Sequence, residues 1–145
     1  MAASASKAII DDDRAGASDS ASVDVQSAIS MLQVELKVSD MTELKALKSP
    51  PKPVCMAGEA VCILFGVEPS WNQFKHLAAN TRQLIASAVA YDTDNVSKEM
   101  LRKLKPLVND ERWTPEHMKK CSVAVMLLSI WVQSVYDYAS QNNQK

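Results

Sequence analysis

The most informative segment of the chain is residues 48–66, which read KSPPKPVCMAGEAVCILFG. Ser49 offers a helix cap, and the prolines after it suit a first helical turn because the amide hydrogens they lack would find no partner there. Gly66 can close the helix in a left-handed turn. The pattern therefore predicts a helix over residues 51–65. Its apolar positions cover more than one stripe, so we expect it to be packed on several sides.

The composition favours an all-helical, intracellular protein. The 145-residue chain is 47% hydrophobic, enough for one core, and its 3 glycines and few aromatic residues favour helix over strand. Cys55, Cys62 and Cys121 have neither the density of a disulfide scaffold nor the spacing of metal ligands. We therefore expect a reducing compartment, no metal and no cofactor. The central helix is shorter than the roughly 20 apolar residues of a membrane crossing, so no membrane partner is expected.

The net charge of −1 conceals an uneven distribution. Residues 1–40 carry three basic and seven acidic side chains, whereas residues 41–145 carry thirteen basic and ten acidic ones. Residues 1–22 combine Ala, Ser and Asp without a sustained apolar period, which predicts a disordered acidic leader. The mildly basic remainder is too weakly charged for a duplex nucleic-acid binder and lacks an aromatic platform for single strands, so no nucleic acid is expected.

Two coiled-coil-like patterns flank the middle of the chain. The first, in residues 23–49, places Val25, Ile29, Leu32 and Leu36 at 4-3-4 spacing. Ser39 and Asp40 offer caps there, so this helix is expected to break or shift register before residue 41. The second follows the start signal Thr114-Pro115 and keeps a 3-4 alternation from Met118 to Ala139.

Short helices are predicted between the two patterns. Ser70 caps the first, residues 81–91 form the next, and residues 92–94 cap a basic helix that Pro106 stops or kinks. The simplest topology is an all-α fold: a small bundle of short helices, residues 50–120, at the tip of a truncated antiparallel coiled coil formed by residues 23–49 and 121–145.

Residues suited to catalysis are scarce. His76 and His117 have no Cys, Asp or Glu at ligand spacing, and no phosphate-binding glycine loop occurs. We therefore expect no enzymatic activity from this chain; a small helical hydrolase would need a nucleophile and base that the sequence does not offer. Glu59 is the one acid within the central apolar helix. It is either held by a structural salt bridge or hydrogen bond, or part of a switchable ion pair.

Basic side chains supply the remaining signal. They occur at the start of the central helix, along the fifth helical segment and at the start of the last helix, and comprise Lys52, Lys98, Arg102, Lys103, Lys105, Lys119 and Lys120. Such runs form either an ordinary solvated helix face or a surface for an acidic partner.

Three segments resemble the microtubule-binding domain at the tip of the dynein heavy-chain stalk. They read LKSPPKPVCMAGEAVCILFG, followed by Trp71; AYDTDNVSKEMLRKLKPLV; and KKCSVAVMLLSIWVQSVYDYA. The resemblance covers residues 38–139. It implies that the flanking patterns are the distal ends of the two stalk helices.

The resemblance also implies a function and partners. The seven basic residues named above would contact tubulin, the rest of a dynein heavy chain would carry the ATPase, and sliding of the stalk helices would regulate affinity. The setting would be the cytoplasm and cytoskeleton. The matching segments resemble axonemal relatives more than cytoplasmic ones, which implies a cilium or flagellum. Many relatives carry a lysine where this chain has Cys55, and Lys52 stands one turn earlier. The alternative is a helical adaptor or scaffold module that docks a partner helix.

Overall fold

The computed structural model describes residues 23–143, so the predicted leader, residues 1–22, lies outside the described part of the chain. Residues 23–143 contain helices and no strand, which confirms the all-α prediction. The elements are α1 (Val25–Glu35), α2 (Val38–Lys45), α3 (Lys52–Leu64), α4 (Trp71–Leu77), α5 (Thr81–Val89), the 3-10 helix η1 (Thr93–Asn95), α6 (Lys98–Val108), α7 (Pro115–Cys121) and α8 (Val123–Asn143).

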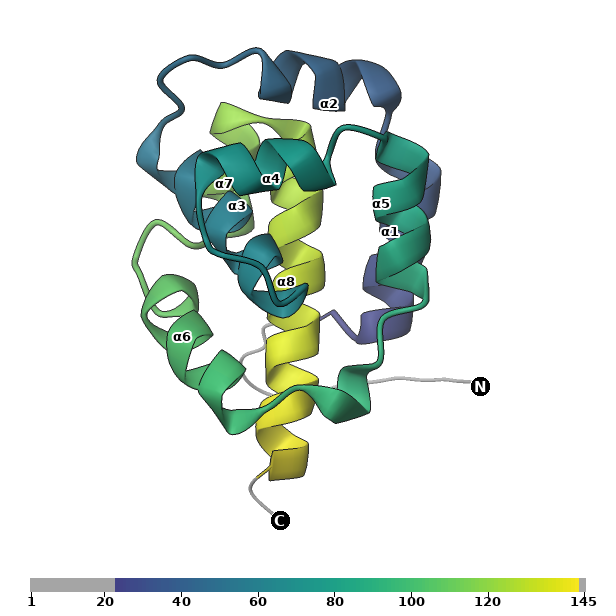
Figure 1. Cartoon of the computed structure of the whole chain (residues 1–145), viewed down its shortest axis with the longest axis vertical. Helices are drawn as coiled ribbons and strands as arrows, with labels where there is room; N and C mark the ends of the chain where they lie inside the picture. Colours follow the sequence, from purple (N-terminus) through teal and green to yellow (C-terminus); the bar gives the residue numbers. More distant parts are fainter. Residues whose placement is uncertain (1–22, 144–145) are drawn as a thin grey trace.

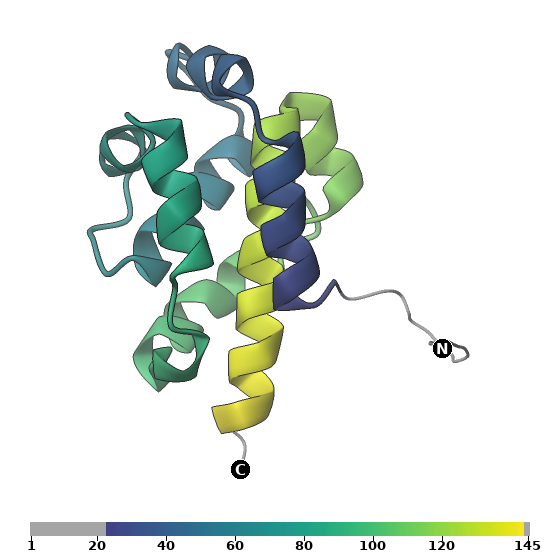
Figure 2. The ribbon, with the colours of Figure 1, turned by 90° about the vertical axis from the view of Figure 1, so that its right-hand side faces the viewer.

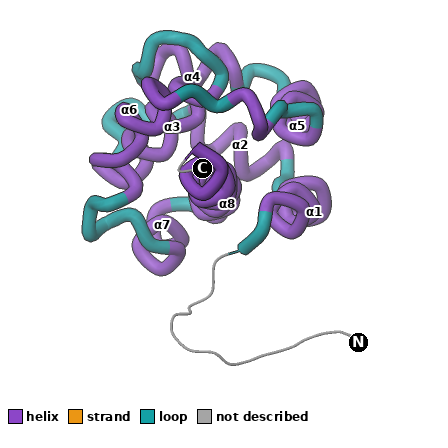
Figure 3. The backbone as a smooth tube through the Cα atoms, turned by 90° about the horizontal axis from the view of Figure 1, so that it is seen from below, coloured by secondary structure: helices purple, strands orange, loops and turns teal. Residues whose placement is uncertain are grey.

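Helix α8 runs through the middle of the bundle. Figure 1 shows the other helices arranged along its length, and the view from below in Figure 3 shows α8 surrounded by them. Its 21 residues span about 32 Å. The buried apolar positions of α8 are Ala124, Val125, Leu127, Leu128, Trp131, Val132, Val135 and Ala139. These include the 3-4 positions of the sequence pattern, so the seam is part of the core.

Helices α1 and α8 lie side by side and antiparallel (Figure 2). Helix α1 starts with the Asp24 carboxylate accepting the Ser27 amide at 2.7 Å, and it buries Ala28, Ile29 and Leu32. The beginning of α1 and the end of α8 point to the same end of the bundle (Figures 1 and 2). We call this the stalk end. The two helices therefore have the relative direction that the sequence predicts for the two arms.

The break in the first arm occurs as predicted, but the predicted caps are wrong. Leu36 and Lys37 are extended, and α2 begins at Val38, before Ser39 and Asp40. No side chain caps α2. Its position is set by burial instead, because Met41 and Leu44 are fully buried.

The central helix α3 matches the prediction at its end and differs at its start. Gly66 has φ 74°, and the Val67 amide donates to the Cys62 carbonyl at 3.0 Å, which closes the helix as expected. The N-cap is Pro51 rather than Ser49, and no side chain caps this end. Helix α3 packs against α4, α6, α7 and α8, so it has neighbours on several sides as its composition predicts.

The predicted single last helix is in fact two helices. Ser122 is extended, with φ −171° and ψ 135°, and separates α7 from α8. Its hydroxyl accepts the Val125 amide at 3.3 Å and so caps α8. The start at Thr114 and Pro115 is confirmed, since the Thr114 hydroxyl accepts the His117 amide at 3.1 Å. Apolar spacing alone cannot reveal a break that leaves the seam positions in the core.

Helix α6 differs from its prediction at both ends. Residues 93–95 form the separate η1, and Ser97, not the preceding aspartates, caps α6 through the Met100 amide at 3.1 Å. Pro106 does not stop the helix, which continues to Val108. Its exposed ring lies near the end of α6, and buried Leu104 and Val108 hold the last turn on the core.

Candidate functional site

The predicted basic residues lie on three helices that meet at α3. Helix α3 packs against both α6 and α7. All seven side chains are exposed, and they comprise Lys52, Lys98, Arg102, Lys103, Lys105, Lys119 and Lys120. Exposed cations on packed helices can form a rigid charged surface, since the backbone beneath them is held by the core.

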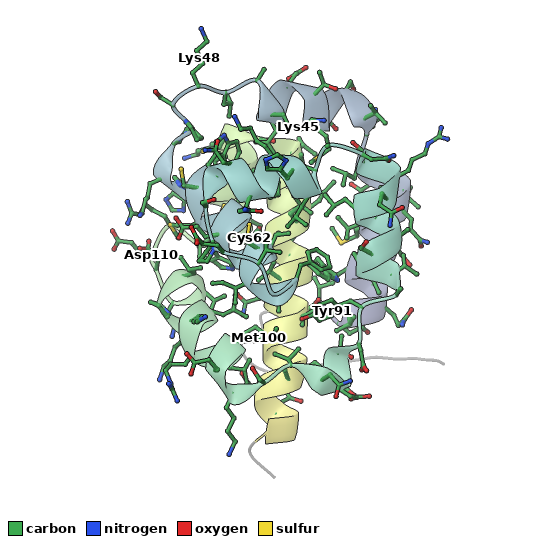
Figure 4. All side chains as sticks on the ribbon, in the orientation of Figure 1. Lys45, Lys48, Cys62, Tyr91, Met100 and Asp110 are labelled. Carbon is green, nitrogen blue, oxygen red and sulfur yellow. The ribbon has the colours of Figure 1, made fainter. Side chains whose placement is uncertain are left out.

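The start of α3 lies close to the loop between α6 and α7. In this loop Arg112 donates hydrogen bonds to Asp110 from its backbone amide, Nε and Nη2, each at 2.9 Å. These bonds, with a smaller contribution from the nearby Lys52 ammonium, lower the pKa of Asp110 to about 2. Figure 4 shows Asp110 at the outer edge of the bundle. The loop therefore places the Asp110 carboxylate, paired with Arg112, near Lys52 in the first turn of α3.

Lys119 and Lys120 occupy the last turn of α7, next to the start of α8. Lys119 lines a polar cavity of about 320 Å³ between α2 and the α7–α8 junction, together with Asp40, Glu43 and Cys121. The acidic side of α2 therefore faces this end of α7. Lys120 is exposed outside that cavity lining.

Lys98 lies far from the α7 lysines. The Tyr138 hydroxyl donates to Asp94 at 2.7 Å, which places the segment before α6 beside the last turns of α8. Val123 and Tyr138 are about 22 Å apart along α8. Lys98 is thus near the stalk end, whereas Lys119 and Lys120 are near the opposite end. The seven cations form an extended band rather than one compact cluster.

The band includes an internal ion pair on α6. Arg102 Nη1 lies 2.7 Å from Glu99 Oε1, and the two side chains are 76% and 57% exposed. Such an exposed pair contributes little to stability, at most about 1 kcal/mol. Arg102 therefore remains available to a stronger anionic partner.

A structural salt bridge is one of the alternatives that the sequence allows for Glu59, and the described residues do not form it. The Glu59 side chain is half-buried on α3, and no cation within residues 23–143 pairs with it. It lies between Cys55 and Cys62 on the helix. Burial, and to a smaller extent the Glu59 charge, raises the pKa of the Cys55 thiol. The same two causes raise the pKa of the Cys62 thiol, partly offset by a hydrogen bond with the Ser70 backbone that lowers it. Protonated thiols of this kind are weak nucleophiles.

An aromatic cluster connects the end of α3 to α8. The Tyr91 hydroxyl donates to the Leu64 carbonyl at 2.6 Å. The Phe65 ring stacks on Trp131 with centroids 5.7 Å apart, and Tyr91 meets Trp131 edge-on at 5.6 Å. The C-terminal end of α3 is therefore tied to α8, while Lys52 lies in the first turn at the other end of α3. No local pattern in the sequence predicts this cluster, because its residues lie far apart in the chain.

Two further cations, Lys48 and Arg112, add to this surface beyond those that the sequence predicts. Arg112 lies in the loop between α6 and α7, and Lys48 is exposed in the loop before α3. The spacing of Asp110 and Arg112 at i and i+2 in a turn is the sequence feature that could have indicated Arg112, because an aspartate there can accept hydrogen bonds from the residue two positions on. Within residues 23–143 there is no cluster of three potential metal ligands and no helix long and apolar enough to span a membrane.

Comparison with known proteins gives consistent matches. Residues 4–140 match the family described as "Microtubule-binding stalk of dynein motor". Dynein axonemal heavy chain 1 of Mus musculus is 27% identical over 117 residues, and dynein axonemal heavy chain 2 of Homo sapiens is 28% identical over 126 residues. These alignments cover 71% and 83% of this chain and 3% of each relative.

The fold comparison agrees with the sequence comparison. A solved structure of the microtubule binding domain of dynein-C matches with a TM-score of 0.68 and 28% identity, covering 81% of this chain and 85% of that one. The family match extends over nearly the whole chain, including all the helices that carry the basic band. The chain therefore belongs to the family of microtubule-binding stalks of dynein motors.

Proposed function

We propose that this domain binds microtubules through the basic band of α3, α6 and α7, with Arg112 of the intervening loop as a further contact. The observation that carries the proposal is the position of seven exposed cations on helices that all pack at α3. Tubulin presents an acidic surface, and several exposed cation contacts add modest, fast-forming and salt-sensitive attraction.

The antiparallel pair α1 and α8 gives this binding a route of regulation. Helix α8 contacts α1 on one side and α3, α6 and α7 on others. A change in the register of α1 against α8 would therefore alter the support of every helix of the basic band. We propose that such a shift sets the affinity for microtubules.

The wider setting follows from the relatives. The chain spans about 3% of the length of the axonemal heavy chains named above. We propose that the remainder of a dynein heavy chain is its partner and carries ATP hydrolysis. The proposed location is the cytoskeleton of a cilium or flagellum, within the axoneme.

The alternative function, a helical adaptor, requires that the apolar face of the last helix be free to bind a partner helix. That face is occupied, because Val125, Leu128, Val132 and Val135 of α8 are all buried within the bundle. An exposed seam, not a buried one, would have favoured an adaptor.

Co-sedimentation with stabilised microtubules at about 50 mM and about 200 mM salt tests the proposal. Saturable pelleting that weakens with salt is expected, and subtilisin-trimmed microtubules show whether the acidic tubulin tails are needed. No pelleting at low salt would count against binding by this band. Fusion of α1 and α8 to a coiled coil of fixed register tests the regulation, since two registers should give two affinities.

Reversal of Arg102 and Lys103 to glutamate tests the α6 part of the band. We expect affinity to fall by more than about tenfold, because two attractive contacts become repulsive. Both side chains are exposed, so the fold should survive, which circular dichroism can verify. Unchanged affinity would remove the middle of α6 from the contact surface.

A further inference from the structure

The full sequence contains two places where a hydroxyl residue precedes proline, Ser49-Pro50 and Thr114-Pro115. A proline-directed protein kinase requires this dipeptide, an accessible hydroxyl and an extended backbone. The sequence assigns the same role, helix capping, to both hydroxyls. The structure separates them, because only Thr114 has that role.

Ser49 is an exposed residue with an unengaged hydroxyl. It lies in the loop between α2 and α3, and no hydrogen bond of its side chain occurs within residues 23–143. The prolines that follow keep the chain extended: Pro51 has φ −59° and ψ 158°. Lys48 and Lys52 flank the site, and Figure 4 shows Lys48 pointing away from the bundle.

The Thr114 hydroxyl, in contrast, is not accessible to a kinase. Thr114 is half-buried, its Oγ1 accepts the His117 amide at 3.1 Å, and it lies 2.8 Å from His117 Nδ1. Its neighbour Trp113 is 8% exposed. A kinase would have to unwind the start of α7 and pull out a packed indole to reach this hydroxyl.

We propose that Ser49 is a phosphorylation site for a proline-directed protein kinase. The Ser49 Oγ attacks the γ-phosphorus of ATP, the new O–P bond replaces the bond between that phosphorus and the β-γ bridging oxygen, and the hydroxyl proton is released. The products are the phosphoserine and ADP. Lys52, three residues after Ser49, supplies the basic position that many such kinases favour.

Phosphorylation changes the charge where the basic band begins. It adds about −1.5 to −2 charges beside Lys48 and Lys52. The start of α3 attracts this group, because the helix has no side-chain cap and no acidic residue in its first turn. The first hydrogen bond inside the helix is donated by the Cys55 amide to the Pro51 carbonyl at 3.1 Å. The backbone amides of Lys52 and Val54 come before it. The phosphate is thus held against Lys52.

The consequence rests on the proposed function. If the basic band binds acidic tubulin, phosphorylation of Ser49 neutralises Lys52 and repels the microtubule. We expect the dissociation constant to rise about fivefold, because one cation is neutralised and one anion is added at an exposed site. Removal of the phosphate by a phosphatase should restore the original affinity.

The first experiment maps the site independently of microtubules. The 145-residue chain is incubated with ATP and a proline-directed kinase, and the phosphorylated residue is identified by mass spectrometry. We expect phosphate on Ser49 and none on Thr114, and no incorporation in Ser49→Ala. Phosphate on Thr114, or none on Ser49, overturns the site assignment.

The second experiment measures co-sedimentation of the phosphorylated and unmodified chains. Kinase-treated Ser49→Ala is the matched control and should bind as the untreated protein does. Equal affinity of the phosphorylated and unmodified chains overturns the regulatory role. An unmodified chain that fails to bind overturns the proposed function and this regulatory role with it, while the site assignment is decided by the first experiment alone.

Discussion

Gly66 has the one positive φ among the described glycines, at 74°. An added Cβ would meet no atom within 4 Å, so only the backbone conformation disfavours another residue. We expect Gly66→Ala to lower the free energy of unfolding by about 1 kcal/mol, measured by urea denaturation. Gly66→Asn should cost less, because asparagine tolerates this region. An unchanged stability in both variants would contradict the argument.

Tyr91 makes stability depend on alkaline pH. Burial, and secondarily the Asp92 charge, raises the pKa of Tyr91 from 10.0 to about 12. The folded state therefore holds this proton more tightly than the unfolded state. The stabilisation is complete below pH 10 and is lost as the pH rises toward 12.

Comparison with Tyr91→Phe isolates this contribution. Loss of the 2.6 Å hydrogen bond to the Leu64 carbonyl should destabilise the variant by about 1 kcal/mol at pH 8. The difference between the two proteins should shrink above pH 10 in urea denaturation. A constant difference up to pH 12 would show that the hydroxyl does not titrate as described.

At the scale of elements, Pro106 weakens α6. It cannot donate the bond that residue 106 would give to the Arg102 carbonyl, although the helix continues to Val108. We expect Pro106→Ala to raise the free energy of unfolding by about 1 to 2 kcal/mol, less than the full proline penalty because the site is near the helix end. Pro106→Gly is the control, with a smaller gain. No gain from alanine would mean that the core requires the proline geometry.

The elements themselves were largely predictable. Apolar spacing, the Ser70 cap, the Thr114-Pro115 start and Gly66 are local signals, and the structure confirms each. The errors lie where two local signals compete. The N-cap of α3 is Pro51 and not Ser49. The apolar spacing continues across Ser122, so it gives no sign that this residue is extended.

For the whole molecule, the extended basic band predicts unequal contributions. Lys98 is near the stalk end, whereas Lys119 and Lys120 lie near the opposite end, about 22 Å away along α8. We expect Lys119→Glu with Lys120→Glu to weaken microtubule binding by more than about tenfold. Lys98→Glu alone should change it by less than about twofold.

Co-sedimentation at constant ionic strength compares these variants. Circular dichroism of each confirms that the helices are intact. A loss from Lys98→Glu as large as from the α7 pair would mean that the contact surface reaches the stalk end. The candidate contacts would then have to be redrawn along all of α6.

The sequence by itself determined the helical class, the antiparallel arms and the types of residue that could meet tubulin, because these follow from spacing, composition and resemblance over contiguous segments. Only the tertiary structure decided which of them lie together. It placed α8 within the bundle, brought Arg112 and Asp110 beside Lys52, and set Lys98 at the other end. The physical reason is that these placements depend on the packing of side chains from segments far apart in the chain, which no local pattern encodes.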